Sequence, residues 1–303
     1  MGFIIISVIW GSTWFAIKVG LESIPPFYGL ALRFTIAMAV FYAMMKLKHE
    51  TLPKDRASKK LFATLGVLSF SIPFALVYWG EQYISSGLAS ILFAVYPFAV
   101  AGISHLVLPN EKLNPYKVGG ITLGFFGLLI IFWSDIHIGT SSTTGMIAVV
   151  VSSMLQAFAL VTVKKSGTHI NPVAMNFGGL IVGVPIMYIM AFAFEDVSSV
   201  HFDMNGVSSI LYLGVLGSVV TFSIYYWLLK KIEAVYLSLV SMVTPVLAVV
   251  LGTLWLHEEF SSRVFSGASL VLCGILFANG KELLGKFLPQ QKELPARPEE
   301  EAA

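Results

Sequence analysis

The chain has 303 residues and a net charge of +2 at pH 7, with 56% hydrophobic and only 12% charged residues. A soluble domain carries about 25% charged residues, so this chain cannot cover a water-facing surface. The composition excludes a soluble enzyme, a disordered protein and a nucleic-acid-binding protein, and the small net charge argues against a polyanionic partner. We expect a membrane protein with no nucleic-acid partner and no metal or cofactor, whose partners are the lipid bilayer and a small molecule.

Ten apolar runs follow one another along the chain, each close to the roughly 20 residues that span a bilayer as a helix. They cover 2–20, 26–45, 61–82, 86–108, 115–133, 144–163, 172–194, 207–229, 235–256 and 264–284. Each run is apolar around most of its circumference, which favours helices in lipid over barrel strands. The sequence therefore predicts an all-α membrane protein with ten transmembrane helices.

The distribution of lysine and arginine predicts the orientation of these helices. With the N-terminus inside, all but three of the 19 basic residues fall in cytoplasmic segments, the exceptions being Lys18, Arg33 and Arg263. We therefore expect a multi-pass protein of the cell inner (plasma) membrane with both termini in the cytoplasm. The polar, Pro- and Glu-rich tail 287–303 is expected to be disordered.

The second half of the chain repeats the first. The matched pairs at a shift of 148 residues include Tyr78 with Tyr226, Trp79 with Trp227, Pro97 with Pro245 and Glu111 with Glu259, and those at a shift of 146 are Lys18 with Lys164 and Pro26 with Pro172. The predicted units are 1–138 and 139–286. Because each unit holds five helices, an odd number, the second enters the membrane upside down, and such inverted repeats are typical of secondary transporters with a central site.

Three stretches carry a family resemblance. They are Trp10–Lys18, Glu81–Ser90 with Pro97, and Ser241–Pro245 with Glu258, Glu259 and Gly267. In these the chain resembles the EamA-type ten-helix transporters of the drug/metabolite transporter superfamily. The resemblance implies a pseudo-twofold bundle in which the first, third, fourth, sixth, eighth and ninth helices surround a central cavity. It also implies export of amino acids, related metabolites or drugs.

Polar and aromatic residues deep in the membrane are candidates for the cavity, because such groups are costly there. The candidate residues are Trp10, Trp14, Tyr78, Tyr96, Gln156, Tyr226, Tyr236 and Ser241. Trp10 lies about 12 Å into the first helix, too deep for an interfacial belt. The competing interpretations are belt anchors for Tyr78 and Tyr226 and an interhelical hydrogen bond for Gln156.

Two prolines and three charged residues complete the candidates. Pro97 and Pro245 occupy matching positions, and a proline inside a helix frees a carbonyl and bends the helix, so both are predicted hinges. Lys18, Arg33 and Glu81 are candidates for an ion pair or for proton coupling, and a structural role is preferred for Arg33.

These observations favour a secondary transporter that exports small amphipathic metabolites, most of all amino acids, by alternating access. The alternative is export of drugs or quaternary amines, held by cation–π contacts. Enzyme chemistry is not expected, because no paired aspartates or His-Glu clusters lie at membrane depth. Motifs beginning at Gly120 and Gly179 allow close helix contact within the bundle or in a homodimer, and a monomer is preferred.

Overall fold

The computed structural model describes residues 1–108, 115–135 and 140–287, and every regular element within these ranges is a helix. The α-helices in chain order are α1 (Gly2–Gly20), α2 (Pro26–Leu47), α3 (Arg56–Leu65), α4 (Ile72–Gly80), α5 (Ser86–Phe93), α6 (Tyr96–Val107), α7 (Pro115–Asp135), α8 (Thr140–Ser166), α9 (Pro172–Phe194), α10 (Met204–Gly214), α11 (Thr221–Leu229), α12 (Ala234–Ser238), α13 (Val240–Trp255) and α14 (Ser262–Phe287). The π-helical segments η1 (Gly66–Ser71) and η3 (Val215–Val220) and the short 3₁₀ turn η2 (Val197–Ser199) complete the described structure. The tail 287–303 lies outside the described residues from position 288 on.

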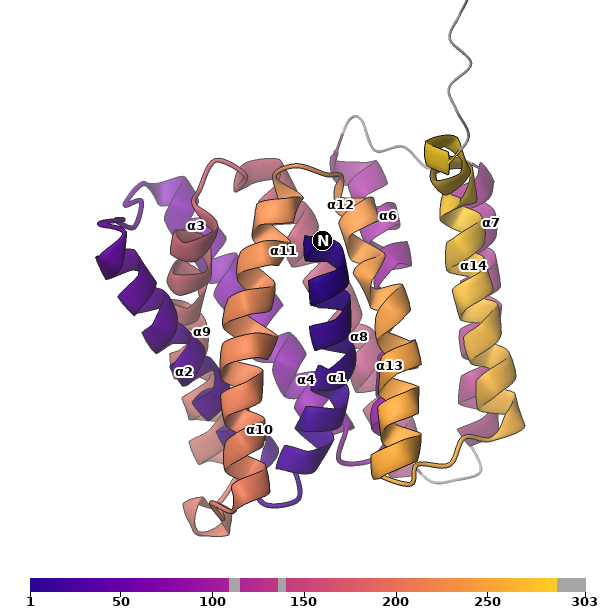
Figure 1. Cartoon of the computed structure of the whole chain (residues 1–303), viewed down its shortest axis with the longest axis horizontal. Coiled ribbons are helices and arrows are strands. Elements are labelled where there is room, and N and C mark those ends of the chain that lie inside the picture. Colours follow the sequence, from indigo (N-terminus) through magenta and orange to yellow (C-terminus); the bar gives the residue numbers. More distant parts are fainter. Residues whose placement is uncertain (109–114, 136–139, 288–303) are drawn as a thin grey trace, which may run out of the picture.

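Eight helical stretches of the described chain are long and apolar enough to cross a membrane. They are Gly2–Gly20, Pro26–Leu47, Arg56–Gly80, Ser86–Val107, Ser141–Ser166, Pro172–Phe194, Met204–Leu229 and Ala234–Trp255. The other two predicted runs, 115–133 and 264–284, fall in α7 and α14, which lie side by side at one edge of the bundle (Figure 1). A helical membrane protein is therefore what the structure supports, and the count of ten spans stays a prediction.

The third predicted run begins earlier than its apolar residues suggest. Helix α3 starts at Arg56 because the Asp55 side chain accepts a hydrogen bond from the Ser58 amide at 2.9 Å and caps the helix. The basic connection before α3 lies at the same end of the bundle as the connection between α11 and α12 (Figure 1). The connection between α9 and α10 lies at the opposite end (Figure 1).

Two long helices are widened by π-helical turns at matching places in the two predicted units. Segment η1 joins α3 to α4, and η3 joins α10 to α11. In each, a serine hydroxyl donates to the carbonyl five residues back: Ser71 to Gly66 O at 2.7 Å and Ser218 to Leu213 O at 2.9 Å. Such turns release carbonyls from the regular ladder and are common at functional sites.

Two other helices are broken near the predicted hinges. Helix α5 ends at Phe93 and α6 begins at Tyr96, so this break directly precedes Pro97. The second break, between α12 and α13, lies at position 239, well ahead of Pro245, which is inside α13. Pro245 leaves the Ser241 carbonyl without its helical donor, and the Thr244 hydroxyl donates to that oxygen at 3.2 Å. The two prolines therefore sit in different local structures.

The hydrogen bonds of two lysines match the predicted repeat. Lys18 donates to the main-chain oxygens of Glu81 and Ile84, the latter at 2.9 Å. Lys164 donates to Leu229 O at 2.9 Å and to the carbonyl at position 232 at 2.7 Å. Glu81 and Leu229 lie 148 residues apart, as do Ile84 and Ile232, and 148 residues is the shift of the sequence repeat. Lys18 thus donates to main-chain oxygens, whereas the candidate ion pair would join it to the Glu81 carboxylate.

The two predicted close-contact motifs are filled by this chain's own helices. A Cβ built on Gly274 of α14 would meet Gly120 O at 2.6 Å, and one built on Gly66 would meet Gly179 O at 2.7 Å. At these distances only glycine allows the backbones to approach. Both motifs therefore pack within the bundle, and the oligomeric state stays a prediction.

Candidate functional site

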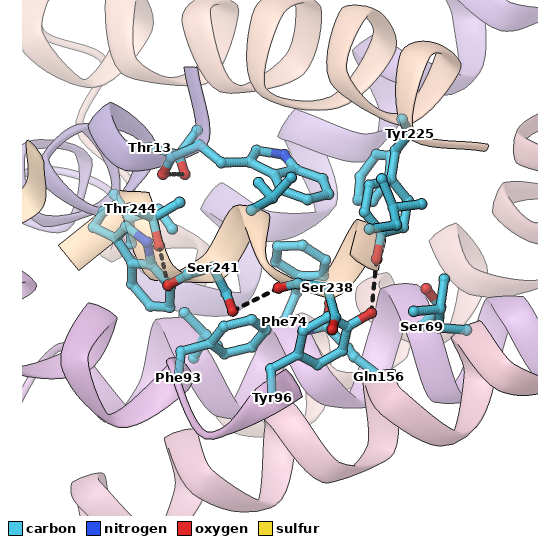
Figure 2. A pocket seen from close by; sticks show the side chains of 18 of the residues that line it. Thr13, Ser69, Phe74, Phe93, Tyr96, Gln156, Tyr225, Ser238, Ser241 and Thr244 are labelled. Carbon is cyan, nitrogen blue, oxygen red and sulfur yellow. Dashed lines mark hydrogen bonds between the residues drawn. The ribbon is translucent and has the colours of Figure 1, made fainter. Parts of the chain in front are cut away.

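A cavity of about 70 Å³ lies between helices of both predicted units (Figure 2). Its lining residues are Trp10, Thr13, Trp14, Ile17, Arg33, Ser69, Phe74, Val77, Phe93, Tyr96, Gln156, Leu160, Phe222, Tyr225, Tyr226, Leu237, Ser238, Val240, Ser241 and Thr244. Among the described residues, α7, α9 and α14 contribute nothing to the lining. This agrees with the arrangement that the resemblance implies, except that α2 contributes Arg33.

A connected set of aromatic rings forms the apolar wall. The Trp10 ring lies 4.9 Å from the Tyr225 ring and 5.6 Å from the Phe222 ring, measured between centroids. The Tyr225 and Tyr96 hydroxyls meet at 2.8 Å (Figure 2). Phe93 then stacks on Tyr96 at 5.5 Å. Rings from α1, α5, α6 and α11 therefore connect the two predicted units through the cavity wall.

Hydroxyl groups of α12 and α13 supply a polar part of the lining. Ser238 donates to Val235 O at 2.6 Å, and Ser241 donates to Ser238 O at 2.8 Å. Figure 2 places Ser238, Ser241 and Thr244 along the same side of the pocket. A hydroxyl has one hydrogen and two lone pairs, so side chains whose hydrogens bind the main chain offer a ligand acceptors rather than donors.

Gln156 lines the cavity from α8, half-buried. Its amide nitrogen donates to the Ser152 hydroxyl at 3.3 Å, one turn earlier in the same helix. The hydrogen bond of the Gln156 side chain is therefore within α8, and not the interhelical bond of the competing interpretation.

Arg33 is only 1% exposed and lines the cavity from α2. Its Nε donates to the Ser218 hydroxyl at 3.0 Å, its Nη2 to Gly217 O at 3.3 Å and its Nη1 to the Tyr78 hydroxyl at 3.4 Å. The guanidinium also lies 4.8 Å from the Phe74 ring centroid. Sequence reasoning preferred a structural role in an outer helix. The structure places Arg33 at the cavity, because the π-helical turn of η3 presents a carbonyl and a hydroxyl to it.

Glu81 is fully buried at the end of α4. Both of its carboxylate oxygens lack a hydrogen-bond partner, and no ion pair joins Glu81 to Lys18 or Arg33 among the described residues. Glu258, by contrast, accepts hydrogen bonds from the main-chain amides of Ser86 at 2.7 Å and Gly87 at 3.1 Å and so caps α5. The Glu258 carboxylate is thus hydrogen-bonded, whereas the neighbouring Glu81 carboxylate is not.

Six of the eight predicted cavity residues line this space. They are Trp10, Trp14, Tyr96, Gln156, Tyr226 and Ser241. Tyr78 instead lies behind Arg33, to which it is hydrogen-bonded. Tyr236 is half-buried outside the lining.

Several lining residues are not among the eight predicted cavity residues. They are chiefly Phe74, Phe93, Phe222, Tyr225, Ser69 and Ser238. Phenylalanine in a membrane helix gives no signal that separates packing from lining, because every face of such a helix is apolar. Tyr225 lies beside Tyr226, and only the packing of α11 shows that both rings face inward. Among the residues that the structure describes, no group of three His, Cys, Asp or Glu residues is placed to hold a metal.

Comparison with known proteins gives consistent matches along the chain. The profile described as the EamA-like transporter family matches residues 1–133 and 143–280. YoaV of Bacillus subtilis (strain 168), named an uncharacterized transporter, is 34% identical over 276 residues, covering 91% of this chain and 94% of that protein. YedA of Escherichia coli (strain K12), named an uncharacterized inner membrane transporter, is 29% identical over 292 residues, covering 96% and 90%. A crystal structure of another protein has the same fold, with a TM-score of 0.70 at 18% identity over 94% of this chain and 97% of that chain.

Proposed function

Because the chain belongs to the EamA-like transporter family and is a multi-pass membrane protein, we propose that it is a secondary transporter exporting small amphipathic metabolites, amino acids foremost. The observation that carries this proposal is the cavity between the two predicted units. Its aromatic wall suits an apolar body, and its few polar groups suit a polar head. The family and the names of the relatives indicate a transporter rather than an enzyme.

The proposal includes ten membrane spans in two inverted five-helix units, 1–138 and 139–286, with both termini cytoplasmic in the inner membrane. The matching π-helical segments η1 and η3 support a repeat that extends beyond sequence. The equivalent hydrogen bonds of Lys18 and Lys164 support it independently. Inverted units that meet around one site are the arrangement through which alternating access operates.

The position of the cavity between the two predicted units supports alternating access. At about 70 Å³ it is smaller than the roughly 300–1,000 Å³ of sites that hold drug-sized ligands. A drug-sized molecule would therefore fit only when the helices around the cavity move apart. A channel would instead need an open polar path.

Export of quaternary amines is the second candidate, and one observation favours it. The Trp10, Phe222 and Tyr225 rings lie together and can hold a cation by cation–π contact. Arg33 lines the same cavity and repels a cation there. Amino acids therefore remain the preferred class.

Counterflow in proteoliposomes tests the proposed function. Liposomes that contain the purified protein and a high internal concentration of unlabelled amino acid should accumulate the labelled form, and the initial rate should saturate with concentration. Liposomes without protein are the control. Flux that stays linear with concentration and shows no counterflow would identify a channel, and failure with every common amino acid would remove the proposed substrate class.

A further inference from the structure

The charge of Arg33 has no counter-ion in the cavity wall. Its five N–H groups meet one serine hydroxyl, one carbonyl and one tyrosine hydroxyl, and the two η nitrogens make their bonds at 3.3 and 3.4 Å. No carboxylate oxygen lies within 4.0 Å of the guanidinium among the described residues. Since arginine remains charged in proteins, a full positive charge borders the cavity, and its hydrogen-bond partners are all neutral.

Neutral dipoles compensate a buried charge only in part, and natural proteins pair such charges with an opposite one. The Glu81 carboxylate interacts electrostatically with Lys18 and Arg33, but it lies beyond the 4.0 Å of an ion pair with either. Its oxygens are without hydrogen bonds, so it does not hold the guanidinium. An anionic group in the cavity would supply the missing partner.

Arg33 has no basic counterpart in the second unit of the sequence repeat. At the 146-residue shift that aligns the first two helices of each unit, Arg33 corresponds to Gly179. A Cβ on Gly179 would already meet the Phe70 ring at 2.8 Å, so no larger side chain fits there. The positive charge is therefore particular to one unit, whereas Lys18 and Lys164 are symmetric and bind main-chain oxygens.

The hydroxyls of α12 and α13 complement this charge. Ser238 and Ser241 have committed their hydrogens to main-chain carbonyls at 2.6 and 2.8 Å. They offer lone pairs to the cavity, which suit an ammonium or another N–H donor. The lining thus combines a charged donor fork, hydroxyl acceptors and an aromatic wall.

From this geometry we infer that Arg33 binds the carboxylate of the transported molecule, so that the substrates are carboxylates with an apolar body, the α-amino acids among them. The inference rests on the proposed function and narrows its substrate class. The planar guanidinium presents parallel donors that match the two oxygens of a carboxylate. A cation without a carboxylate would leave Arg33 unpaired and add a second positive charge beside it.

The test compares acids with their amides on the purified full-length protein in detergent. L-leucine is paired with L-leucinamide and L-phenylalanine with L-phenylalaninamide, and 3-phenylpropionate serves as an acid without an ammonium group. Ligand binding to the folded state raises the apparent melting temperature. We expect the three acids to raise the apparent melting temperature in a way that saturates with ligand concentration. Both amides should leave the melting temperature unchanged.

Three variants assign the effect to Arg33. R33Q removes the charge, R33K keeps the charge without the fork, and R263Q removes an exposed arginine at the start of α14 as the matched control. R33Q should weaken acid binding at least about tenfold, the loss expected for a charge-assisted hydrogen-bonded pair, with R33K in between. R263Q should bind like the wild type.

Equal stabilisation by an acid and its amide overturns the inference, as does a lack of binding by all three acids or unchanged acid binding in R33Q. If R33Q does not fold, the wild-type comparison of acid with amide decides alone. Counterflow separates this result from the proposed function. Transport of an amide as fast as its acid refutes the role of Arg33 and leaves a transporter, whereas Arg33-dependent binding without any counterflow refutes transport.

Discussion

Single side chains in the cavity act in sets that span different helices. The Gly217 carbonyl accepts hydrogen bonds from Trp10 Nε1 at 3.3 Å, Arg33 Nη2 at 3.3 Å and the Thr221 hydroxyl at 2.8 Å. Three donors converge on one oxygen because η3 removes it from the regular helical ladder. A change at Trp10 therefore alters both the aromatic wall and the surroundings of Arg33.

Replacing a cavity residue should weaken substrate binding, whereas replacing an aromatic residue at the surface should not. Trp10→Ala removes two ring contacts, and we expect it to weaken substrate affinity about tenfold. Gln156→Ala should weaken it as well. Trp227 is the matched control, because it is 47% exposed and lies against the Lys231 ammonium, 3.8 Å from its ring centroid. Trp227→Ala should bind normally. The measurement is substrate-dependent thermal stabilisation, and equal losses in all three variants would contradict the assignment.

The two neighbouring acids should respond oppositely to loss of charge. Glu81→Gln replaces a buried carboxylate that has no hydrogen-bond partner with a neutral side chain of the same shape, so the melting temperature should stay the same or rise. Glu258→Ala removes the acceptor of two main-chain amides and should cost about 1 kcal/mol. Thermal unfolding in detergent measures both changes. A large loss in Glu81→Gln would show that its carboxylate has a partner in the folded protein.

Proton coupling by Glu81 stays a prediction at this scale. The charged neighbours that act on the carboxylate are Lys18, Glu258 and Arg33. If Glu81 carries the coupled proton, Glu81→Gln should transport at the same rate with and without a pH gradient across the liposome membrane. A response to the gradient that matches the wild type would exclude this role.

At the scale of the element, interruptions coincide with the cavity. Four helical stretches that line it are interrupted: α3–α4 by η1, α10–α11 by η3, and α5–α6 and α12–α13 by breaks. Helices α7, α9 and α14, which do not reach the lining, run without a break over their described lengths. Helices α1, α2 and α8 also line the cavity and have no such break. Interruptions free main-chain groups for ligands and for movement, so the four interrupted stretches are the lining segments suited to rearrange.

Replacing the two prolines should slow movement more than it affects binding. Pro97→Ala allows α5 and α6 to join, and Pro245→Ala restores a helical donor to Ser241 O. We expect lower transport rates with affinity changed only a few fold, because a shifted population scales affinity by the competent fraction. Initial rates of counterflow and ligand-dependent thermal shifts are the two readouts. Full transport rates in both variants would show that the prolines are merely tolerated.

The capping of α10 should make its stability depend on pH. Asp203 accepts hydrogen bonds from the Gly206 amide at 2.7 Å and the Ser23 hydroxyl at 2.9 Å. These bonds, the Gly206 amide first, lower the pKa of Asp203 from its ordinary value of 3.8. Because the folded pKa lies below the unfolded one, the stabilisation is present above 3.8 and is lost as pH falls through the folded pKa.

Asp203→Ala should therefore melt at a lower temperature than the wild type at neutral pH, and the difference should shrink as the solution becomes more acidic than the ordinary Asp pKa. Asn205→Ala, an exposed position in the first turn of the same helix, is the control and should show no such trend. Melting curves in detergent across this pH range provide the measurement. A difference that is constant with pH would contradict a charge-dependent cap.

At the scale of the whole molecule, the proposal depends on how the two units sit in the membrane. The basic connection 46–60 and the acidic connection 195–206 lie at opposite ends of the bundle (Figure 1). With both termini inside, the first faces the cytoplasm and the second the outside. The equivalent lysine contacts at Lys18 and Lys164 would then lie at opposite membrane faces, as inversion requires.

Single cysteines test this orientation. The exposed Cys273 is first replaced by serine, and one cysteine is then placed in 46–60 or in 195–206. A membrane-impermeant reagent added to intact cells should label only the second, and opening the cells should make the first reactive. Labelling of 46–60 in intact cells would overturn both the orientation and the inverted arrangement.

Local hydrophobicity is enough to establish the membrane class, the helical structure and the approximate bounds of the spans, because the bilayer requires about 20 apolar residues whatever their neighbours. The repeat is equally legible, since prolines, tyrosines and lysines recur at fixed shifts. The sequence does not predict which face of each helix turns toward the cavity. Helices in lipid are apolar on every side, so no amphipathic pattern distinguishes the inward face from the others. Only the tertiary structure shows that Arg33 lines the cavity, and that Tyr226 lines it whereas the equivalent Tyr78 does not. It also shows that Glu81 is buried beside Lys18, which binds the Glu81 main-chain oxygen instead of its carboxylate.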